Sequence, residues 1–261
     1  MPVNDDLGKR MKEYYEHVYR FGLTRRMPVA IRIDGKAFHT FTRGFQKPFD
    51  EVLVTTMQRT MKYLCENIQG CKLGYTQSDE ITLILTDYDT LTTEAWFGYE
   101  LQKMCSIAAS MATMAFNKFF NEEVNNWYYT CPIDSNKDEL WESYMKSIDK
   151  GAMFDARVFN IPKEEVCNLV YWRQLDAARN SIQMVGQANF SHSELQHKSC
   201  NMIQKMLMTE KGINWNDFPT HLKRGSCCVK TPSGWHIDKE IPMFKNEYRA
   251  YVDELIYIEG E

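Results

Sequence analysis

The sequence predicts an α+β protein built on a ferredoxin-like βαββαβ unit, with further helices and short strands after it. Short apolar or alternating runs, which are typical of strands, occur at 27–31, within 71–85 and at 154–159. Between them, residues 49–68 and 94–119 carry apolar side chains every three or four positions, as helices do. The resulting order of strand, helix, strand, strand, helix and strand is that of a split βαβ arrangement.

The ends of the two helices in this unit are marked by particular residues. The first should begin after Pro48 and end at Gly70, because proline suits a first helical turn and glycine tolerates the left-handed cap. The second should be capped by Thr92 or Thr93, whose hydroxyls can accept from the first turn, and should continue to Phe119.

The whole chain is expected to form one globule. Residues 1–160 would be a palm-like catalytic domain with 27–120 as its core, and the polar, Asn-rich stretch 121–152 would be an insertion or loop with a short helix. Residues 161–261 would complete the globule with helices and short strands. An amphipathic helix over residues 5–21 is expected to pack against the rest.

Composition restricts the class of protein. Apolar residues make up 44% of the 261, which is typical of a globular chain, and no apolar stretch approaches the length of a membrane span. The eight cysteines have no CxxC spacing, so we expect reduced thiols, no zinc site and a cytoplasmic location. The net charge of −4 counts mildly against a dedicated nucleic-acid binder, but a local basic face would still bind one.

Three carboxylates lie at strand ends. Asp34 follows the strand at 27–31, and Asp79 and Glu80 lie at the tip of the hairpin. If these strands are neighbours, the carboxylates converge, and they repel one another unless a cation lies between them. Mg²⁺ together with a substrate triphosphate is the usual occupant of such a site. The pattern therefore suggests two-metal nucleotidyl transfer of the polymerase-palm kind.

Several side chains near these acids have two possible roles. The loop from Phe38 to Phe49 is aromatic and basic, which suits a nucleotide base and its phosphates, although Phe38, Phe41 and Phe45 could equally be core residues. Lys103 is a lone cation on an otherwise apolar helix. It is either a phosphate contact or a surface lysine whose stem covers apolar neighbours.

A basic segment follows in the last third of the chain. From Lys198 to Lys230 there are six Lys or Arg residues and two acids, interleaved with Trp215, Phe218 and His221. Cations combined with aromatic rings suit an RNA backbone and unstacked bases. The preceding helix adds a polar face, which could also be merely solvated. The candidate RNA contacts on this helix and in the basic segment are Arg173, Asp176, Arg179, Asn180, Lys198, Lys205, Lys223 and Arg224.

Three motifs together resemble a known family. Over most of residues 27–230, the chain resembles the tRNA-histidine guanylyltransferase superfamily. The first motif is Arg32-Ile33-Asp34-Gly35-Lys36-Ala37-Phe38-His39 with Gly74-Tyr75-Thr76-Gln77-Ser78-Asp79-Glu80, the second is Tyr171–Asp176, and the third is Lys211–Trp215. The resemblance implies a palm-like enzyme that works in the 3′–5′ direction at the 5′ end of tRNA. It also implies ATP, GTP and other nucleoside triphosphates as partners and a homotetramer built as a dimer of dimers.

The resemblance also assigns roles to individual residues. Asp34 and Asp79, with the backbone carbonyl of Gly35, would hold two Mg²⁺ ions per active site, and Glu80 matches the acid beside the second aspartate. Nucleotide or triphosphate contacts are implied for Arg32, Lys36, Ala37, Phe38, His39, Lys47, Ser78 and Lys103. Asp176 and Asn180 match positions of the second motif.

One departure distinguishes branches of the family. The members that read the histidine anticodon have a histidine where this chain has Ala178, and an Asn-Asn-Leu-Tyr pattern in place of Asn180-Ser181-Ile182-Gln183. The chain is therefore more similar to the bacterial and archaeal guanylyltransferase-like branch, which is associated with templated repair of 5′-truncated tRNA. The alternatives are a tRNA-histidine guanylyltransferase adding G at position −1, a palm-type nucleotide cyclase, or a tRNA-binding module without catalysis.

Overall fold

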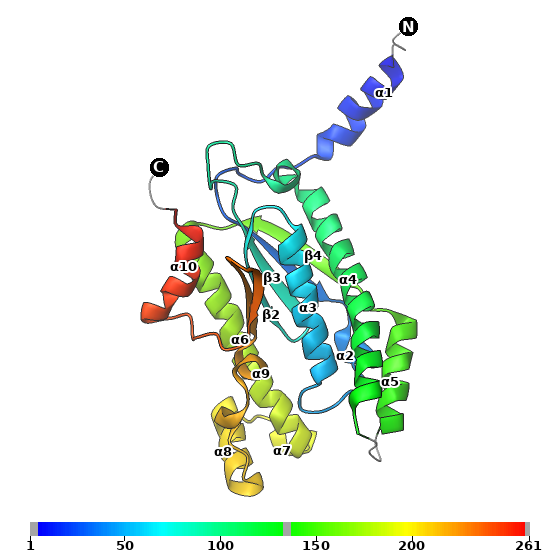
Figure 1. Cartoon of the computed structure of the whole chain (residues 1–261), viewed down its shortest axis with the longest axis vertical. Helices are drawn as coiled ribbons and strands as arrows, with labels where there is room; N and C mark the ends of the chain where they lie inside the picture. The colour runs from blue at the N-terminus through cyan, green and yellow to red at the C-terminus, as the bar shows by residue number, and fades with distance from the viewer. Residues whose placement is uncertain (1–4, 133–136, 259–261) are drawn as a thin grey trace.

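The computed structural model describes residues 5–132 and 137–258, and it contains one six-stranded antiparallel sheet with helices on both faces (Figure 1). The strand order across the sheet is β4-β1-β3-β2-β5-β6. The strands are β1 (Val29–Gly35), β2 (Cys71–Gln77), β3 (Glu80–Leu85), β4 (Phe154–Asn160), β5 (Ser226–Thr231) and β6 (Gly234–Asp238). The first four form the expected βαββαβ unit, and β5 and β6 extend it.

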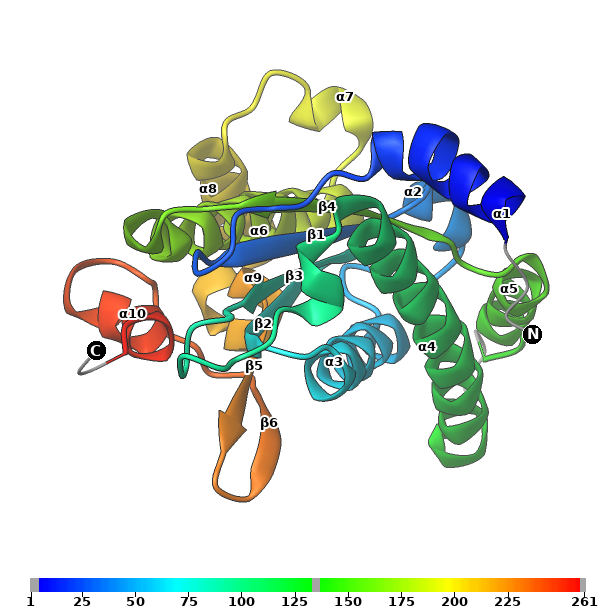
Figure 2. The same ribbon diagram turned by 90° about the horizontal axis from the view of Figure 1, so that it is seen from above.

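The sheet lies between two helical layers (Figure 2). On one face, α3 (Glu51–Asn67) and α4 (Leu101–Thr130) cover the larger hydrophobic core. On the other, α6 (Lys163–Asn189) and α10 (Ala250–Ile256) cover a smaller one. Because successive side chains of a strand point to opposite faces, β3 supplies both cores and is buried along its whole length.

The α6 face of the two central strands is partly polar. On β3, Ile81 and Leu83 belong to the core beneath α3 and α4, whereas Ile84 belongs to the core beneath α6. The alternation therefore places Glu80 on the α6 side. The same reasoning places Asp34 there, since Ile33 faces α3 and α4. Asp34 and Glu80 thus lie on the face that α6 covers.

The second helix of the unit begins later than expected. Phe97, Gly98 and Tyr99 have φ of 51°, 62° and 61°, which no right-handed helix accommodates. Residues Trp96–Tyr99 form a separate short turn, η3. The helix α4 therefore starts only after it, at Leu101. The prediction of a cap at Thr92 or Thr93 was wrong.

The stretch 121–152 is mostly helical, and the loop prediction was wrong there. Helix α4 continues to Thr130, and α5 (Lys137–Lys150) follows, with residues 133–136 of the predicted insertion outside the described residues. The polar composition concealed an apolar stripe, since Phe120, Val124 and Trp127 recur at helical spacing and pack on the core, which includes Tyr144 of α5.

The C-terminal part contains α7 (His192–Leu195), α8 (Cys200–Lys211) and α9 (Thr220–Arg224). His197, with φ of 61°, lies between α7 and α8 and separates the two helices. A small third core joins the end of α6 to α8 through Val185, Ile203 and Leu207. None of the helices in the described ranges has both the length and the apolarity that crossing a membrane requires. All eight cysteines are free thiols.

The N-terminal segment does not pack as expected. It consists of α1 (Asp6–Met11), the π-helical turn η1 (Lys12–Glu16) and the 3₁₀ turn η2 (His17–Tyr19), and it projects away from the body (Figure 1). Its apolar side chains are exposed, for example Leu7 at 61%, Tyr14 at 66% and Val18 at 59%. The periodicity indicated a helix with an apolar face, but no part of residues 5–132 and 137–258 covers that face.

Candidate active site

The two stretches that carry Asp34 and Asp79 lie side by side. Strands β1 and β3 are antiparallel neighbours, and in their register Asp34 lies opposite Glu80. One residue further on, the backbone N–H of Gly35 donates to the carbonyl of Asp79 at 3.1 Å. The expectation that these segments converge, although forty-five residues separate the two aspartates (79 − 34), is confirmed.

The surroundings of Asp79 disfavour its ionised form. Burial raises the pKa of Asp79, and the nearby charges of Asp34 and Glu80 raise it further, while a 3.0 Å hydrogen bond from Ser78 Oγ partly offsets these effects. Within residues 5–132 and 137–258, no lysine or arginine forms an ion pair with Asp34 or Asp79. The turn therefore holds carboxylates that an external cation would stabilise.

The donor set fits a magnesium ion. Carboxylate oxygens and the backbone carbonyl of Gly35 are the hard ligands that Mg²⁺ prefers, and Mg²⁺ usually takes its other ligands from phosphates and water. No group of three or more His, Cys, Asp or Glu side chains arranged to hold a metal occurs in the described part of the chain. A metal here would therefore share its coordination with a substrate.

A further carboxylate, Asp155, lies next to Asp34. In the register of β1 with β4, Asp34 is paired with Asp155, so both side chains stand on the same face of the sheet. Sequence reasoning predicted the strand at 154–159 but did not single out Asp155. Only the register of the two strands reveals this neighbour.

The backbone around the acids is held in uncommon conformations. Ala37 and Ser78 both have left-handed φ angles, 54° and 51°, which cost free energy for residues other than glycine and are enriched at functional sites. Gly35 is required for a different reason. A Cβ there would lie 2.3 Å from Cδ2 of Phe38, so only glycine lets this ring lie beneath the strand end.

A cleft beside the two aspartates collects most of the predicted nucleotide contacts. The predicted residues among its lining are Gly35, Ala37, Phe38, His39, Lys47, Ser78 and Asp79. His39 and Lys47 are exposed, so they offer a titratable ring and a cation to an anionic ligand. The sequence reasoning missed Gln46, Asp50, Met184 and Gln187, which also line the cleft.

Asp50 is an acid with a structural task. It caps the N-terminus of α3, accepting from the backbone N–H of Leu53 at 2.9 Å and of Gln46 at 3.0 Å. The hydroxyl of Tyr144 also donates to it at 2.7 Å. Burial raises the pKa of Asp50. An aspartate just after Pro48 and before an apolar helix was a signal for a cap that could have been used.

The aromatic residues of the following loop are core residues, one of the two roles considered. Phe38, Phe41 and Phe45 are buried, and their rings pack on Phe116, Phe120 and one another. The ring of Phe38 therefore supports Gly35 from the core side. Phe38 also lines the cleft, so its expected contact with a nucleotide stays a prediction.

Three predicted nucleotide contacts lie outside the cleft lining: Lys103, Lys36 and Arg32. Lys103 is exposed over the ring of Phe97 at 5.0 Å, near the start of α4. The part of α4 beside Gly35 is Thr113, whose Oγ1 accepts from the N–H of Phe154 at 3.2 Å. At 1.5 Å rise per residue, these positions are about 15 Å apart. The structure therefore does not bring Lys103 to the acids of its own chain. Lys36 is exposed beside the strand end.

Glu80 is held in a buried ion-pair network rather than being open to a ligand. Arg173 of α6 donates through Nε and Nη2 to its two oxygens, at 2.6 and 2.7 Å, and Arg32 Nη2 donates at 2.7 Å. The side chains of Glu80 and Arg173 are each only 5% exposed. Glu80 was expected to be catalytic, and Arg32 was expected to hold phosphate. Their ion pairs instead position β1 and β3 against α6.

The candidate RNA contacts divide by exposure. Arg173 is buried against Glu80, and Lys223 is buried with Nζ donating to the carbonyl of Asn216 at 2.5 Å, so neither presents its charge to RNA, contrary to expectation. Asp176 accepts from Arg173 and from Arg179. Among the candidate RNA contacts, the exposed cations are Arg179, Lys198 and Lys205, whereas Asn180 and Arg224 are partly buried.

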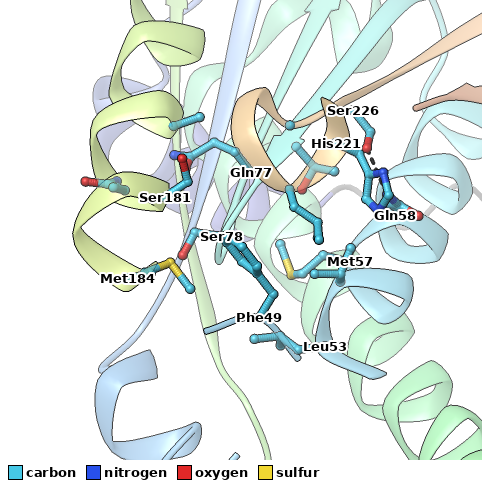
Figure 3. Close-up of a pocket in the computed structure, with 16 residues that line it drawn as sticks. Phe49, Leu53, Met57, Gln58, Gln77, Ser78, Ser181, Met184, His221 and Ser226 are labelled. Atoms are coloured by element: carbon cyan, nitrogen blue, oxygen red, sulfur yellow. Dashed lines mark hydrogen bonds between the residues drawn. The ribbon is translucent and has the colours of Figure 1, made fainter. Parts of the chain in front are cut away.

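A second cavity, distinct from the cleft but sharing Leu53, Ser78 and Met184 with it, lies between α3, α6, α9 and the end of β2 (Figure 3). Its walls are largely apolar, and Gln77, Asn180 and His221 are among the polar residues that line it. The basic segment predicted to bind RNA contributes His221 to this lining.

A four-stranded antiparallel βαββαβ unit with paired acids at the ends of adjacent central strands is typical of palm-like enzymes that act on nucleotides. Comparison with known proteins makes the class specific. The profile of the family described as tRNAHis guanylyltransferase matches residues 8–162, which is more than half of the chain. The chain therefore belongs to the tRNA-histidine guanylyltransferase family, and it is a nucleotidyltransferase.

Relatives and solved structures agree with this assignment. A bacterial tRNA(His) guanylyltransferase-like protein in complex with ATP is 46% identical, with a TM-score of 0.83 over 97% of this chain and 100% of that one. A bacterial protein of the same description in complex with GTP is 40% identical, with a TM-score of 0.78 over the same shares. The tRNA(His) guanylyltransferase of Schizosaccharomyces pombe is 26% identical over 86% of this chain and 84% of its own. The similarity to the two bacterial structures supports placing this chain in the bacterial and archaeal guanylyltransferase-like branch of the family.

Proposed function

We propose that this enzyme adds nucleotides in the 3′–5′ direction to the 5′ end of truncated tRNA, choosing each by pairing with the opposite strand. The observation that carries the proposal is the meeting of Asp34 and Asp79 at the ends of adjacent strands, beside a cleft that presents His39 and Lys47. The choice of repair over guanylylation is supported by the similarity to bacterial guanylyltransferase-like proteins and by Ala178.

The proposed reaction has two phosphoryl-transfer steps. First, the 5′-monophosphate of the tRNA attacks the α-phosphorus of ATP or GTP, a new phosphoanhydride forms, and pyrophosphate leaves. Second, the 3′-hydroxyl of the incoming nucleoside triphosphate attacks the activated 5′-phosphorus, and the nucleoside monophosphate leaves. Such transfers need positioning and charge neutralisation more than covalent help from the protein.

Asp34, Asp79 and the carbonyl of Gly35 are the residues that would hold two Mg²⁺ ions. When bound, these ions would neutralise phosphate charge and favour ionisation of the attacking oxygen. The chain's own residues would do the rest. Lys47 and His39 would bind phosphate oxygens in the cleft, and Ser78, which donates to Asp79, would keep that carboxylate oriented. Arg179, Lys198 and Lys205 are the exposed cations that we assign to the RNA backbone.

We also propose a cytoplasmic location and a homotetramer. Assembly is supported by the exposed apolar side chains of the projecting N-terminal segment, because a contiguous exposed apolar surface is typical of protein interfaces.

The function is tested with tRNAs that lack their first nucleotide and differ in the base opposite the gap. With Mg²⁺, ATP and all four nucleoside triphosphates, we expect addition of the complementary nucleotide in each case, measured by sequencing the 5′ end. Addition of G irrespective of the opposing base would reject the repair proposal.

The second candidate is guanylylation of histidine tRNA at position −1, which is favoured by the family profile that matches this chain. Full-length histidine tRNA in the same assay separates the two. Preferential addition of one G to this substrate, with no extension of truncated tRNAs, would support the second candidate instead.

A further inference from the structure

An open groove lies where the last turns of α6 meet α7 and α8, at the end of the molecule that these helices form (Figure 1). Its floor is apolar and consists of Phe190, Leu195 and Ile203 of the third core. Gly186 allows the helices to approach closely, because a Cβ there would lie 2.8 Å from Cγ2 of Ile203. The groove has a volume of about 580 Å³, which is within the range of ligand-binding clefts.

The rim of the groove is polar and carries no carboxylate. It consists of three carboxamides, two imidazoles and one ammonium group, which belong to Gln183, Gln187, Gln196, His192, His197 and Lys198. All six side chains are exposed, and none of them makes a hydrogen bond or an ion pair with another described residue. The whole rim is therefore available to a ligand.

The acid nearest to this rim in the sequence is already engaged. Glu194 of α7 does not line the groove, and its Oε2 accepts from the backbone N–H of Ser191 at 2.7 Å and from the hydroxyl of Ser191 at 2.6 Å. Lys211 adds a second exposed cation beside the floor, with Nζ 5.2 Å from the ring centroid of Phe190. The charges around the groove therefore favour an anionic ligand.

This combination of groups suits unpaired RNA. Imidazole rings can stack on bases that have left a helix, and carboxamides can pair with base edges because they carry both a donor and an acceptor. Lys198 supplies positive charge for the phosphates of the strand. A free phosphate ion would use only this charge and would leave the apolar floor and the imidazole faces without a partner.

The position of the groove connects it to the catalytic cleft. Gln187 lines both of them. In the proposed reaction the 5′ end of the tRNA lies at Asp34 and Asp79, and the opposite strand of the stem continues past this end as unpaired 3′ nucleotides. These nucleotides need a binding surface close to the cleft.

We propose that the groove binds the unpaired 3′ nucleotides of the tRNA and thereby holds the templating strand in place. This inference rests on the proposed function, and it specifies which part of the tRNA contacts the end of α6, α7 and α8.

The test changes the RNA and the protein together. One truncated tRNA keeps its complete 3′ end, and a second is shortened so that its 3′ strand stops at the nucleotide opposite the gap. The Kd of each RNA is measured by fluorescence anisotropy at one salt concentration, without nucleotides. The wild type should bind the complete RNA at least about fivefold more tightly, because stacking and phosphate contacts are lost with the 3′ nucleotides.

Two groove variants should lose this preference. Lys198→Glu reverses the charge of the rim. His197→Gly removes a ring and suits the left-handed φ of 61°, so the fold should be retained. Each variant should bind the complete RNA several-fold more weakly than the wild type does, while its Kd for the shortened RNA should stay within about twofold of the wild type.

Lys205→Glu is the matched control, because Lys205 is an exposed lysine of α8 that does not line the groove. Any effect of this substitution should be equal for the two RNAs, so the preference for the complete RNA should remain. Folding of each variant is checked by circular dichroism and thermal unfolding.

The contrary outcomes can be told apart. Equal affinity of the wild type for the two RNAs would overturn the proposal, and so would a preference that both groove variants retain, since the 3′ nucleotides would then bind elsewhere. In both cases, templated addition to truncated tRNA would leave the proposed function standing. If the wild type instead shows the preference and the groove variants lose it, but no templated addition occurs, the proposed function fails and the binding site for the 3′ nucleotides stands.

Discussion

Arg173 Nε donates to Glu80 Oε1 at 2.6 Å, and this contact ties helix α6 to strand β3 next to the catalytic turn. Both side chains are almost fully buried, and the second guanidinium nitrogen pairs with the other carboxylate oxygen. A buried, two-point ion pair of this kind fixes geometry rather than presenting charge to a ligand. It distinguishes Glu80 from its neighbour Asp79, which has no such partner among the described residues.

We predict that breaking this pair mainly affects stability. Arg173→Met leaves Glu80 buried with Arg32 as its remaining cation, and we expect the free energy of unfolding to fall by about 3–5 kcal/mol. The double variant Glu80→Gln/Arg173→Met removes the stranded charge and should recover part of the loss. Urea unfolding measures both.

The same pair yields a functional contrast. Glu80→Gln should retain Mn²⁺ binding in the presence of ATP, measured by electron paramagnetic resonance, although nucleotide addition will be reduced. Loss of metal binding in Glu80→Gln, with the fold intact, would contradict the positioning role.

Asp79→Asn should abolish nucleotide addition and yet stabilise the metal-free protein. The folded-state pKa of Asp79 lies above its ordinary value of 3.8, mainly because of burial. The stability that this group contributes is fully present below the ordinary pKa and is lost as pH rises through the folded pKa. Above its folded-state pKa the wild type therefore lacks this stability, and the amide removes the penalty.

Thermal unfolding checks this prediction. Without metal at pH 7, Tm of Asp79→Asn should rise by about 2–4 °C for each kcal/mol of penalty removed. At a pH below the ordinary value, the difference should shrink. With Mg²⁺ and ATP, only the wild type should gain stability, because a ligand that binds the native state shifts Tm. Asp34→Asn serves as the companion variant and should likewise lack nucleotide addition.

Gly35→Ala should disturb the strand end through packing alone. The added methyl would lie 2.3 Å from a carbon of the Phe38 ring, which is itself held by Phe41 and Phe116. Overpacking of this kind costs about 1–3 kcal/mol and should displace the carbonyl proposed to bind metal. We therefore expect reduced stability and much reduced activity.

The second substitution Phe38→Leu makes this prediction specific. It vacates the space that the methyl needs, so the double variant Gly35→Ala/Phe38→Leu should recover activity relative to Gly35→Ala. No recovery, with a folded double variant, would show that the clash is not the cause.

The exposed apolar side chains of the N-terminal segment predict an effect on assembly. Tyr14→Glu and Val18→Glu place charges where the side chains are 66% and 59% exposed, so the fold of the chain should be unaffected. If this surface contacts a second copy, the pair of substitutions should lower the oligomeric mass measured by light scattering. An unchanged mass would remove the support for the proposed tetramer, and Leu91→Glu, at a separate position that is 80% exposed, is the matched control.

The sequence by itself determined the βαββαβ order and placed Asp34 and Asp79 at the ends of strands. Strands and hairpins are encoded locally, by apolar runs and turn residues, so the pattern of residues is enough to place acids at their ends. The helical continuation through residues 121–130 was also encoded, by Phe120, Val124 and Trp127, but the polar composition around them obscured it.

Only the tertiary structure decided which charged residues are available. Arg173 and Lys223 look in sequence like the exposed cations Arg179 and Lys205, yet burial commits them to Glu80 and to the carbonyl of Asn216. Strand register paired Asp34 with Asp155, and the packing of α6 and α9 around β2 created the cavity that holds Gln77 and His221. These relations depend on contacts between residues far apart in the chain, which no local pattern specifies.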